Sequence, residues 1–113
     1  MEDQLLRSIV VLIEAQMGTY KMPITRETSL EKDLGIMGDD AVELLLAYSQ
    51  EFDVDVSKLN LGKYFTPEGD TILPAILRML SGKKETKDSE LTVGDLEKGA
   101  VAKQLNEEII KGP

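Results

Sequence analysis

The chain has 113 residues, no cysteine, histidine or tryptophan, and 21 acidic against 13 basic side chains, which gives a formal net charge of −8. Without cysteine and histidine the chain has no disulfide, no thiolate or imidazole metal site and no histidine as general base. The excess of acidic side chains counts against nucleic acid as a partner, because nucleic-acid phosphates bind to basic patches. No apolar run reaches the roughly 20 residues of a membrane span, and the N-terminus is acidic where a signal peptide is basic. We therefore expect one cytoplasmic, non-enzymatic domain over residues 1–113.

The first expected element is an amphipathic helix over residues 4–17. Its apolar side chains recur at three- and four-residue steps, which is the spacing of one helix face. They are Leu5, Ile9, Leu12, Ile13 and Met17, with Leu6 and Val10 widening the stripe. Glu2 and Asp3 suit the positive end of the helix dipole, and Gly18 suits a helix stop.

The segment that follows, residues 19–27, is expected to be a loop, since it contains Pro23 and shows no periodicity. Thr28 and Glu31 stand at the spacing of a capping box, in which a hydroxyl and a carboxylate satisfy the first backbone amides of a helical turn. Gly35 follows closely, so we expect no more than a short turn here.

The second helix is expected over residues 39–52. Gly38 or Asp39 can cap it, and the acidic side chains in its first turns suit the helix dipole. Its core face consists of Ala41, Leu44, Leu45, Tyr48 and Phe52, with Val42 and Leu46 towards one flank. The alternation of aspartate and valine over residues 53–56 then predicts extended chain, for which we find no partner strand in the sequence.

Residues 57–90 are expected to form an enlarged connection between the second helix and the last one. The apolar spacing within it predicts an extra helix over residues 70–81, in which Pro74 is tolerated only in the first turn. A polar loop over residues 82–90 follows.

The last helix opens with a second capping-box pattern, Thr92 followed by Asp95. Its apolar face consists of Leu96, Ala100, Val101 and Leu105. We expect residues 107–113 to be a frayed tail. Helices joined by long loops, with no pair of strands, predict an all-α bundle rather than an alternating α/β fold.

One segment resembles the start of a calcium-binding loop, with Asp53, Asp55 and Ser57 at alternate positions. Lys58 stands where such a loop needs glycine, and Tyr64 stands where it needs a bidentate glutamate. No serine has a histidine to activate it. We therefore expect neither a metal site nor a catalytic residue.

The negative charge is concentrated in the middle of the chain. Residues 27–55 hold nine acidic side chains and one basic side chain, Lys32, so this segment accounts for the whole net charge of −8. Such a segment is either a solvated helix face with its loops or a surface that attracts a basic partner by its field.

The same segment resembles the centre of the acyl carrier proteins. That family reads Asp-Leu-Gly-x-Asp-Ser-Leu-Asp-x-Val-Glu-Leu, and residues 33–44 read, without a gap, Asp-Leu-Gly-Ile-Met-Gly-Asp-Asp-Ala-Val-Glu-Leu. The helix ends in Glu-Phe with Val56 four residues on, as in the family. Residues 91–96 also resemble the opening of the family's last helix. An alternative alignment makes residues 70–81, instead of 92–106, the final carrier helix.

The resemblance implies a small acidic four-helix bundle, here with an extra helix in the enlarged loop, whose second helix docks on basic surfaces of partner enzymes. The residues expected at that partner-binding surface are Asp39, Asp40, Val42, Glu43 and Leu46. The resemblance also allows a non-covalent acyl chain between the helices. We expect an adaptor or regulator for a lipid- or polyketide-pathway enzyme, and a monomer.

The chain departs from the family at the residue that carries its cofactor. Acyl carrier proteins attach 4′-phosphopantetheine to a serine, and Gly38 occupies that position. Glycine has no hydroxyl, so no cofactor is expected there, and Asp39 and Asp40 are expected to replace part of the phosphodiester charge at the helix end. The Gly-Asp-Asp-Ala sequence is similar to that of a group of bacterial carrier-like proteins. The alternative is a working carrier modified at another serine, of which Ser29 is the best candidate.

Overall fold

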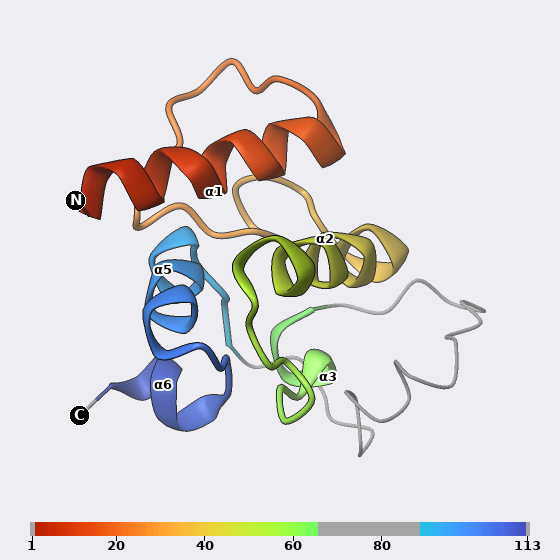
Figure 1. Cartoon of the computed structure of the whole chain (residues 1–113). Coiled ribbons are helices and arrows are strands. Elements are labelled where there is room, and N and C mark those ends of the chain that lie inside the picture. Colours follow the sequence, from red (N-terminus) through yellow and green to blue (C-terminus); the bar gives the residue numbers. More distant parts are fainter. Residues whose placement is uncertain (1, 66–88, 113) are drawn as a thin grey trace.

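The computed structural model describes residues 2–65 and 89–112. Within these ranges the chain forms five helices and no regular strand, which confirms the all-α class. The helices are α1 (Glu2–Met17), α2 (Gly38–Phe52), α3 (Leu61–Tyr64), α5 (Val93–Ala102) and α6 (Glu107–Lys111). Helix α1 packs against both α2 and α5, and α6 packs against α5 (Figure 1). The extra helix expected over residues 70–81 lies outside the described residues.

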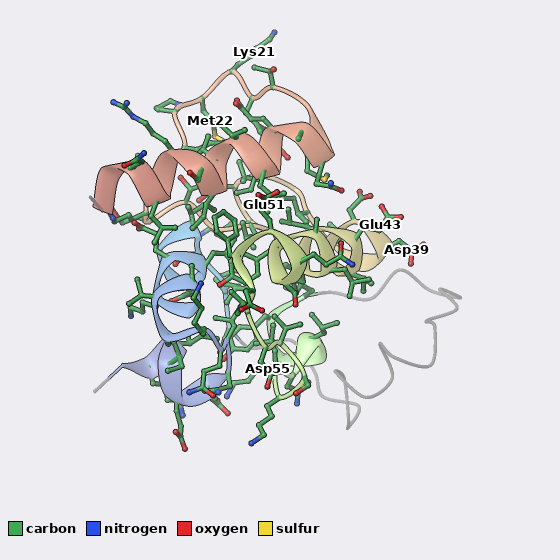
Figure 2. The ribbon with its side chains drawn as sticks, viewed as in Figure 1. Lys21, Met22, Asp39, Glu43, Glu51 and Asp55 are labelled. Atoms are coloured by element: carbon green, nitrogen blue, oxygen red, sulfur yellow. The ribbon has the colours of Figure 1, made fainter. Side chains whose placement is uncertain are left out.

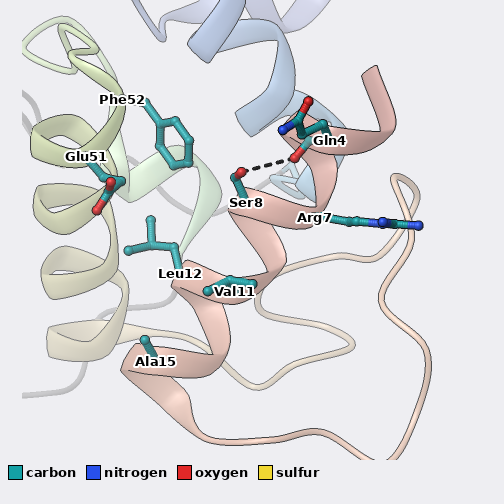
Figure 3. Close-up of a pocket in the computed structure, with 8 residues that line it drawn as sticks. All are labelled: Gln4, Arg7, Ser8, Val11, Leu12, Ala15, Glu51 and Phe52. Carbon is teal, nitrogen blue, oxygen red and sulfur yellow. Dashed lines mark hydrogen bonds between the residues drawn. The ribbon is translucent and has the colours of Figure 1, made fainter. Parts of the chain in front are cut away.

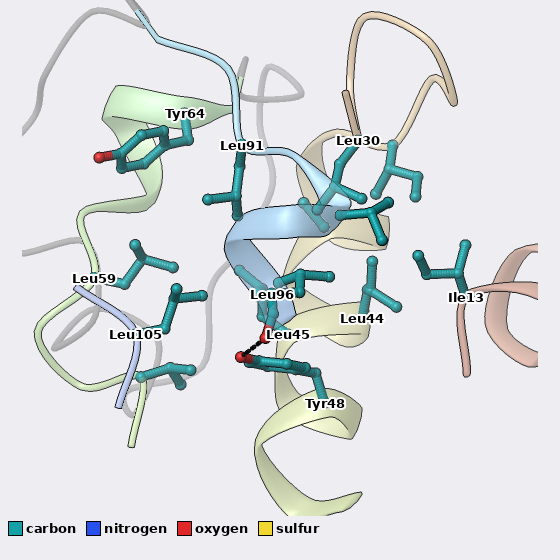
Figure 4. Close-up of a cluster of buried hydrophobic side chains, with 14 of the residues drawn as sticks. Ile13, Leu30, Leu44, Leu45, Tyr48, Leu59, Tyr64, Leu91, Leu96 and Leu105 are labelled. Carbon is teal, nitrogen blue, oxygen red and sulfur yellow. Dashed lines mark hydrogen bonds between the residues drawn. The ribbon is translucent and has the colours of Figure 1, made fainter. Parts of the chain in front are cut away.

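The core is formed by apolar side chains from every part of this bundle (Figure 4). Its largest fully buried members are Tyr48, Ile9, Ile13, Leu30, Ile36, Leu44, Leu45, Leu59, Leu91, Leu96 and Leu105. The expected faces of α1 and α2 supply most of the helical ones, although Phe52 is only partly buried. Val101 was expected on the core face of α5, but 76% of its surface is exposed.

Local capping fixes where the helices begin and end. Thr92 forms the capping box expected of it, since its hydroxyl accepts from the Asp95 amide and the Asp95 carboxylate accepts from the Thr92 amide. The earlier turn is capped one residue later than expected. There Ser29, not Thr28, accepts from the backbone amide of Lys32. Gly35 ends that turn with a left-handed φ of 72°.

Two isolated bridges join segments that are far apart in the sequence. Ser29 pairs with Thr92 in antiparallel fashion, so the turn before α2 is attached to the start of α5. Asp55 pairs with Gln104 in parallel fashion, which is the partner that we did not find for the extended residues 53–56. The backbone amide of Ser89 also bonds to the carbonyl oxygen of Lys63 at 3.2 Å.

Residues 107–111 form helix α6 where a frayed tail was expected. The side chain of Asn106 caps it by accepting from the amide of Ile109. Lys63 forms an ion pair with Glu107 and so connects α6 to α3, and Ile110 packs against the core. Helix α6 is therefore part of the bundle.

Candidate partner-binding surface

The resemblance to acyl carrier proteins assigns their cofactor serine to the start of α2, at Gly38. The N-cap residue of α2 is Met37, in extended conformation, and no side chain caps the helix. Our expectation that Gly38 or Asp39 would cap it was therefore wrong. Gly38 has φ +57°, in the left-handed region that favours glycine over residues with a side chain. A glycine at this position thus suits the local backbone as well as removing the hydroxyl.

Acidic side chains surround this helix end. Asp39, Asp40 and Glu43 are exposed. In Figure 2, Asp39 and Glu43 extend into solvent from the N-terminal end of α2. None of the three forms an ion pair within residues 2–65 and 89–112. Their charges are therefore available to attract a basic surface.

The two apolar residues expected on this surface differ in burial. Leu46 is partly buried and keeps some of its side chain accessible. Val42 is 8% exposed and belongs to the core cluster. The surface that the structure presents at α2 therefore consists of Asp39, Asp40, Glu43 and Leu46, which we call the α2 acidic surface.

Tyr20 supports the segment that leads into α2, a role that sequence patterns did not reveal. Its hydroxyl donates to the carbonyl oxygen of Leu34 at 3.0 Å. Burial, and to a smaller extent the Asp40 carboxylate, raises the pKa of Tyr20 above its ordinary value. An isolated aromatic residue in a loop indicates that its side chain packs against the fold. The sequence does not indicate which backbone atom its hydroxyl group contacts.

Ser29, the best alternative attachment residue, is 5% exposed. Its hydroxyl oxygen accepts from the backbone amide of Lys32 and also bonds to the carboxylate of Glu90. Its own backbone amide donates to the Asp33 carboxylate at 2.8 Å. The hydroxyl is therefore engaged inside the fold and would have to leave these partners before any modification.

Two further serines, Ser49 and Ser57, differ in how they are held. Ser49 donates to the carbonyl oxygen of Val54 at 2.5 Å. Ser57 is exposed, and its amide donates to the Asp55 carboxylate. The hydrogen bonds from Ser57, with Lys58 adding a smaller effect, hold the pKa of Asp55 below its ordinary value. Within residues 2–65 and 89–112, no group of three or more acidic side chains is placed to hold a metal ion.

A separate open pocket of about 560 Å³ lies between α1 and α2 (Figure 3). Leu12 and Phe52 face each other across it, and Ser8 lies beside them. Val11 and Glu51 also line the pocket from opposite helices. None of the residues of the α2 acidic surface lines it, so the two features are distinct.

Comparison with known proteins places this chain in a family. The model of the family described as "Protein of unknown function (DUF1493)" matches residues 2–105. The chain belongs to this family. None of the helices in the part of this DUF1493 member that the structure describes combines the length and the apolar character needed to cross a membrane.

Curated relatives of this DUF1493 member are acyl carrier proteins. The one from Trieres chinensis is 39% identical over 57 residues, which is 50% of the chain and 71% of the relative. The one from Cyanidioschyzon merolae is 29% identical over 91 residues, 80% of the chain and 94% of the relative. The one from Guillardia theta is 27% identical over 55 residues, 49% of the chain and 68% of the relative. No solved structure matches the chain significantly. The DUF1493 member is therefore acyl-carrier-like.

Proposed function

We propose that the chain is a non-enzymatic, acyl-carrier-like binding module that carries no phosphopantetheine at the start of α2. The observation that carries this proposal is Gly38. It occupies the cofactor position in the ungapped match, and its φ of +57° is one that serine rarely adopts. The module would act as an adaptor or regulator for a lipid- or polyketide-pathway enzyme in the cytoplasm.

The α2 acidic surface is the proposed contact with that enzyme. Asp39, Asp40 and Glu43 project three charges from one helix end, and Leu46 adds an apolar contact beside them. A basic surface on the partner would complement this charge pattern, raise the association rate and make binding sensitive to salt.

The alternative is a working carrier that is modified at another serine. The hydrogen bonds of Ser29 and its burial count against this serine, because a transferase must reach a free hydroxyl. A non-covalent acyl chain is a further ligand that the module would accept only if the packed helices separate.

Attachment is tested by intact-mass analysis after incubation with coenzyme A and a phosphopantetheinyl transferase. An acyl carrier protein with its serine is included in the same reaction as the positive control. We expect the control to gain one arm and the chain to keep its mass. A gain of one arm by the chain would overturn the proposal, and the modified peptide would identify the serine.

Recognition by α2 is tested with Gly38→Ser in the same assay. If the surrounding surface still fits carrier-dependent enzymes, this variant gains the arm, more slowly than the control because serine is strained at this φ. Adding Glu43→Lys should slow the reaction further, and adding Glu108→Lys, a matched change on α6, should not. Equal rates for the two double variants would remove Glu43 from the contact.

A further inference from the structure

The side of α1 that borders the open pocket beside α2 is exposed, and it differs from the α2 acidic surface. Val11 lies on it and is 64% exposed, the second most exposed of the large apolar side chains in the described residues. Gln4, Ser8 and Ala15 are exposed with it and line the pocket between α1 and α2. Steps of four, three and four residues place these four positions in one stripe along the helix, the spacing of a seam between two packed helices.

Two opposite charges flank this stripe. Arg7 and Glu14 are seven residues apart, which is close to two full helical turns, so they lie on the same side of the stripe. Neither forms an ion pair within residues 2–65 and 89–112. Arg7 is exposed and extends away from α2 in Figure 3. The face therefore presents an exposed apolar residue with one unpaired positive and one unpaired negative charge beside it.

We propose that this face binds a second copy of the same chain, with the two α1 helices packed antiparallel about a two-fold axis. In that arrangement Arg7 lies opposite Glu14 of the partner subunit, and the same ion pair forms again on the other side of the axis. Helix α1 thus carries both members of the ion pair, Arg7 and Glu14. A partner of another kind would need its own matching pair of charges, whereas a second copy supplies it.

The register of the stripe and that of the charges are close to each other. The stripe of Gln4, Ser8, Val11 and Ala15 is symmetric about the midpoint between Ile9 and Val10. The charge pair is symmetric about the midpoint between Val10 and Val11. These centres differ by one residue, so the pairings across the axis differ by two residues, or about 3.0 Å along the helix. The long side chains of Arg7 and Glu14 span this offset, so one antiparallel alignment accommodates both the apolar contact and the ion pairs.

This inference does not depend on the proposed function, and it replaces our sequence-based expectation of a monomer. Small side chains at Ser8 and Ala15 let the helix backbones approach, and Val11 of each copy contacts the other near the axis. The contact involves one helix from each copy, so its area falls below that of a standard stable interface. We therefore expect a weak, concentration-dependent dimer.

The experiment is sedimentation of the full chain from about 1 μM to about 1 mM, the range in which interfaces of this size dissociate. The average mass should rise with concentration from 12.5 kDa towards twice that value. Arg7→Glu and Glu14→Arg should each raise the dissociation constant at least about tenfold, because each places two like-charged pairs across the axis. Val11→Asp should abolish association.

The decisive sample is a mixture of the two charge variants. A mixed dimer of Arg7→Glu with Glu14→Arg has opposite charges at both ion-pair positions, so mixing should restore association, as should the double variant. Glu108→Lys on α6 is the matched control and should leave the dissociation constant unchanged, and circular dichroism checks that every variant is folded. A chain that stays at 12.5 kDa throughout, or a dimer indifferent to the α1 variants, would overturn the proposal.

Discussion

The Tyr48 hydroxyl donates a hydrogen bond of 2.7 Å to the carbonyl oxygen of Leu96, and so links α2 to α5 through the centre of the core (Figure 4). Tyr48 is completely buried. The absence of a side chain at Gly99 makes room for it, since a Cβ built there would overlap the hydroxyl and lie 3.0 Å from Cδ1 of Leu105. The packing of α2 on α5 therefore depends on a phenol and a glycine together.

Gly99→Ala is expected to destabilise the protein by about 1–3 kcal/mol, the usual cost of overpacking a core, although alanine favours a helix over glycine. The measurement is the free energy of unfolding from urea denaturation. Val101→Ala, a change at an exposed position of the same helix, is the matched control and should change stability little. In the Tyr48→Phe background the cost of Gly99→Ala should shrink, because the atom that the new Cβ overlaps is gone. A fully additive double variant would contradict this account.

Stability is expected to fall above pH 10 through Tyr48. Burial raises the pKa of Tyr48 above its ordinary 10.0, so the folded chain keeps the proton at a pH where the unfolded chain loses it. The contribution is complete below pH 10 and declines by up to about 1.4 kcal/mol per pH unit as the pH rises further. The measurement is the difference in unfolding free energy between the wild type and Tyr48→Phe at pH 9 and pH 11. A difference that does not change with pH would exclude this ionisation as a cause.

Thr92→Ala is expected to lower the unfolding free energy by about 1–2 kcal/mol. The variant removes the hydroxyl that accepts from the Asp95 amide and leaves that helix-end donor without its cap. Thermal or urea unfolding gives the value. Thr92→Ser keeps the hydroxyl and should restore most of the loss, while equal effects of alanine and serine would assign the cost to the lost methyl group.

Replacing Asp39 and Asp40 together with asparagine is expected to lower stability by about 1 kcal/mol. Both carboxylates lie at the positive end of the α2 dipole, where no side chain caps the helix. The loss should be smaller at high salt, since both groups are exposed. The melting temperature of the double variant at low and high salt provides the test. No loss at low salt would mean that these charges do not stabilise the helix end.

Sequence patterns predicted the elements that are long or that carry a complete local signal. Helices α1 and α2 span several turns, so their apolar periodicity identifies both the helix and its buried face. The start of helix α5 was predicted from the Thr92 capping box, a local pattern that involves only residues three positions apart. The assignment of Gly38 to the cofactor position depends on the ungapped match to acyl carrier proteins and stays a prediction.

The remaining features depend on contacts between distant residues, which periodicity does not encode. Helices α3 and α6 are too short for a periodic pattern, and the partner of residues 53–56 is Gln104, far along the chain. Val42 lies at the edge of the α2 core face, and whether such an edge is covered depends on how neighbouring segments pack. The same limit explains Val101, which has the right spacing on α5 but no neighbour to cover it.

The hydrogen bond between the Lys63 carbonyl and the Ser89 amide joins two positions that are far apart in the sequence. It holds residues 63 and 89 next to each other in the fold. The separation of two spectroscopic labels at these positions would therefore report whether this side of the bundle opens in solution.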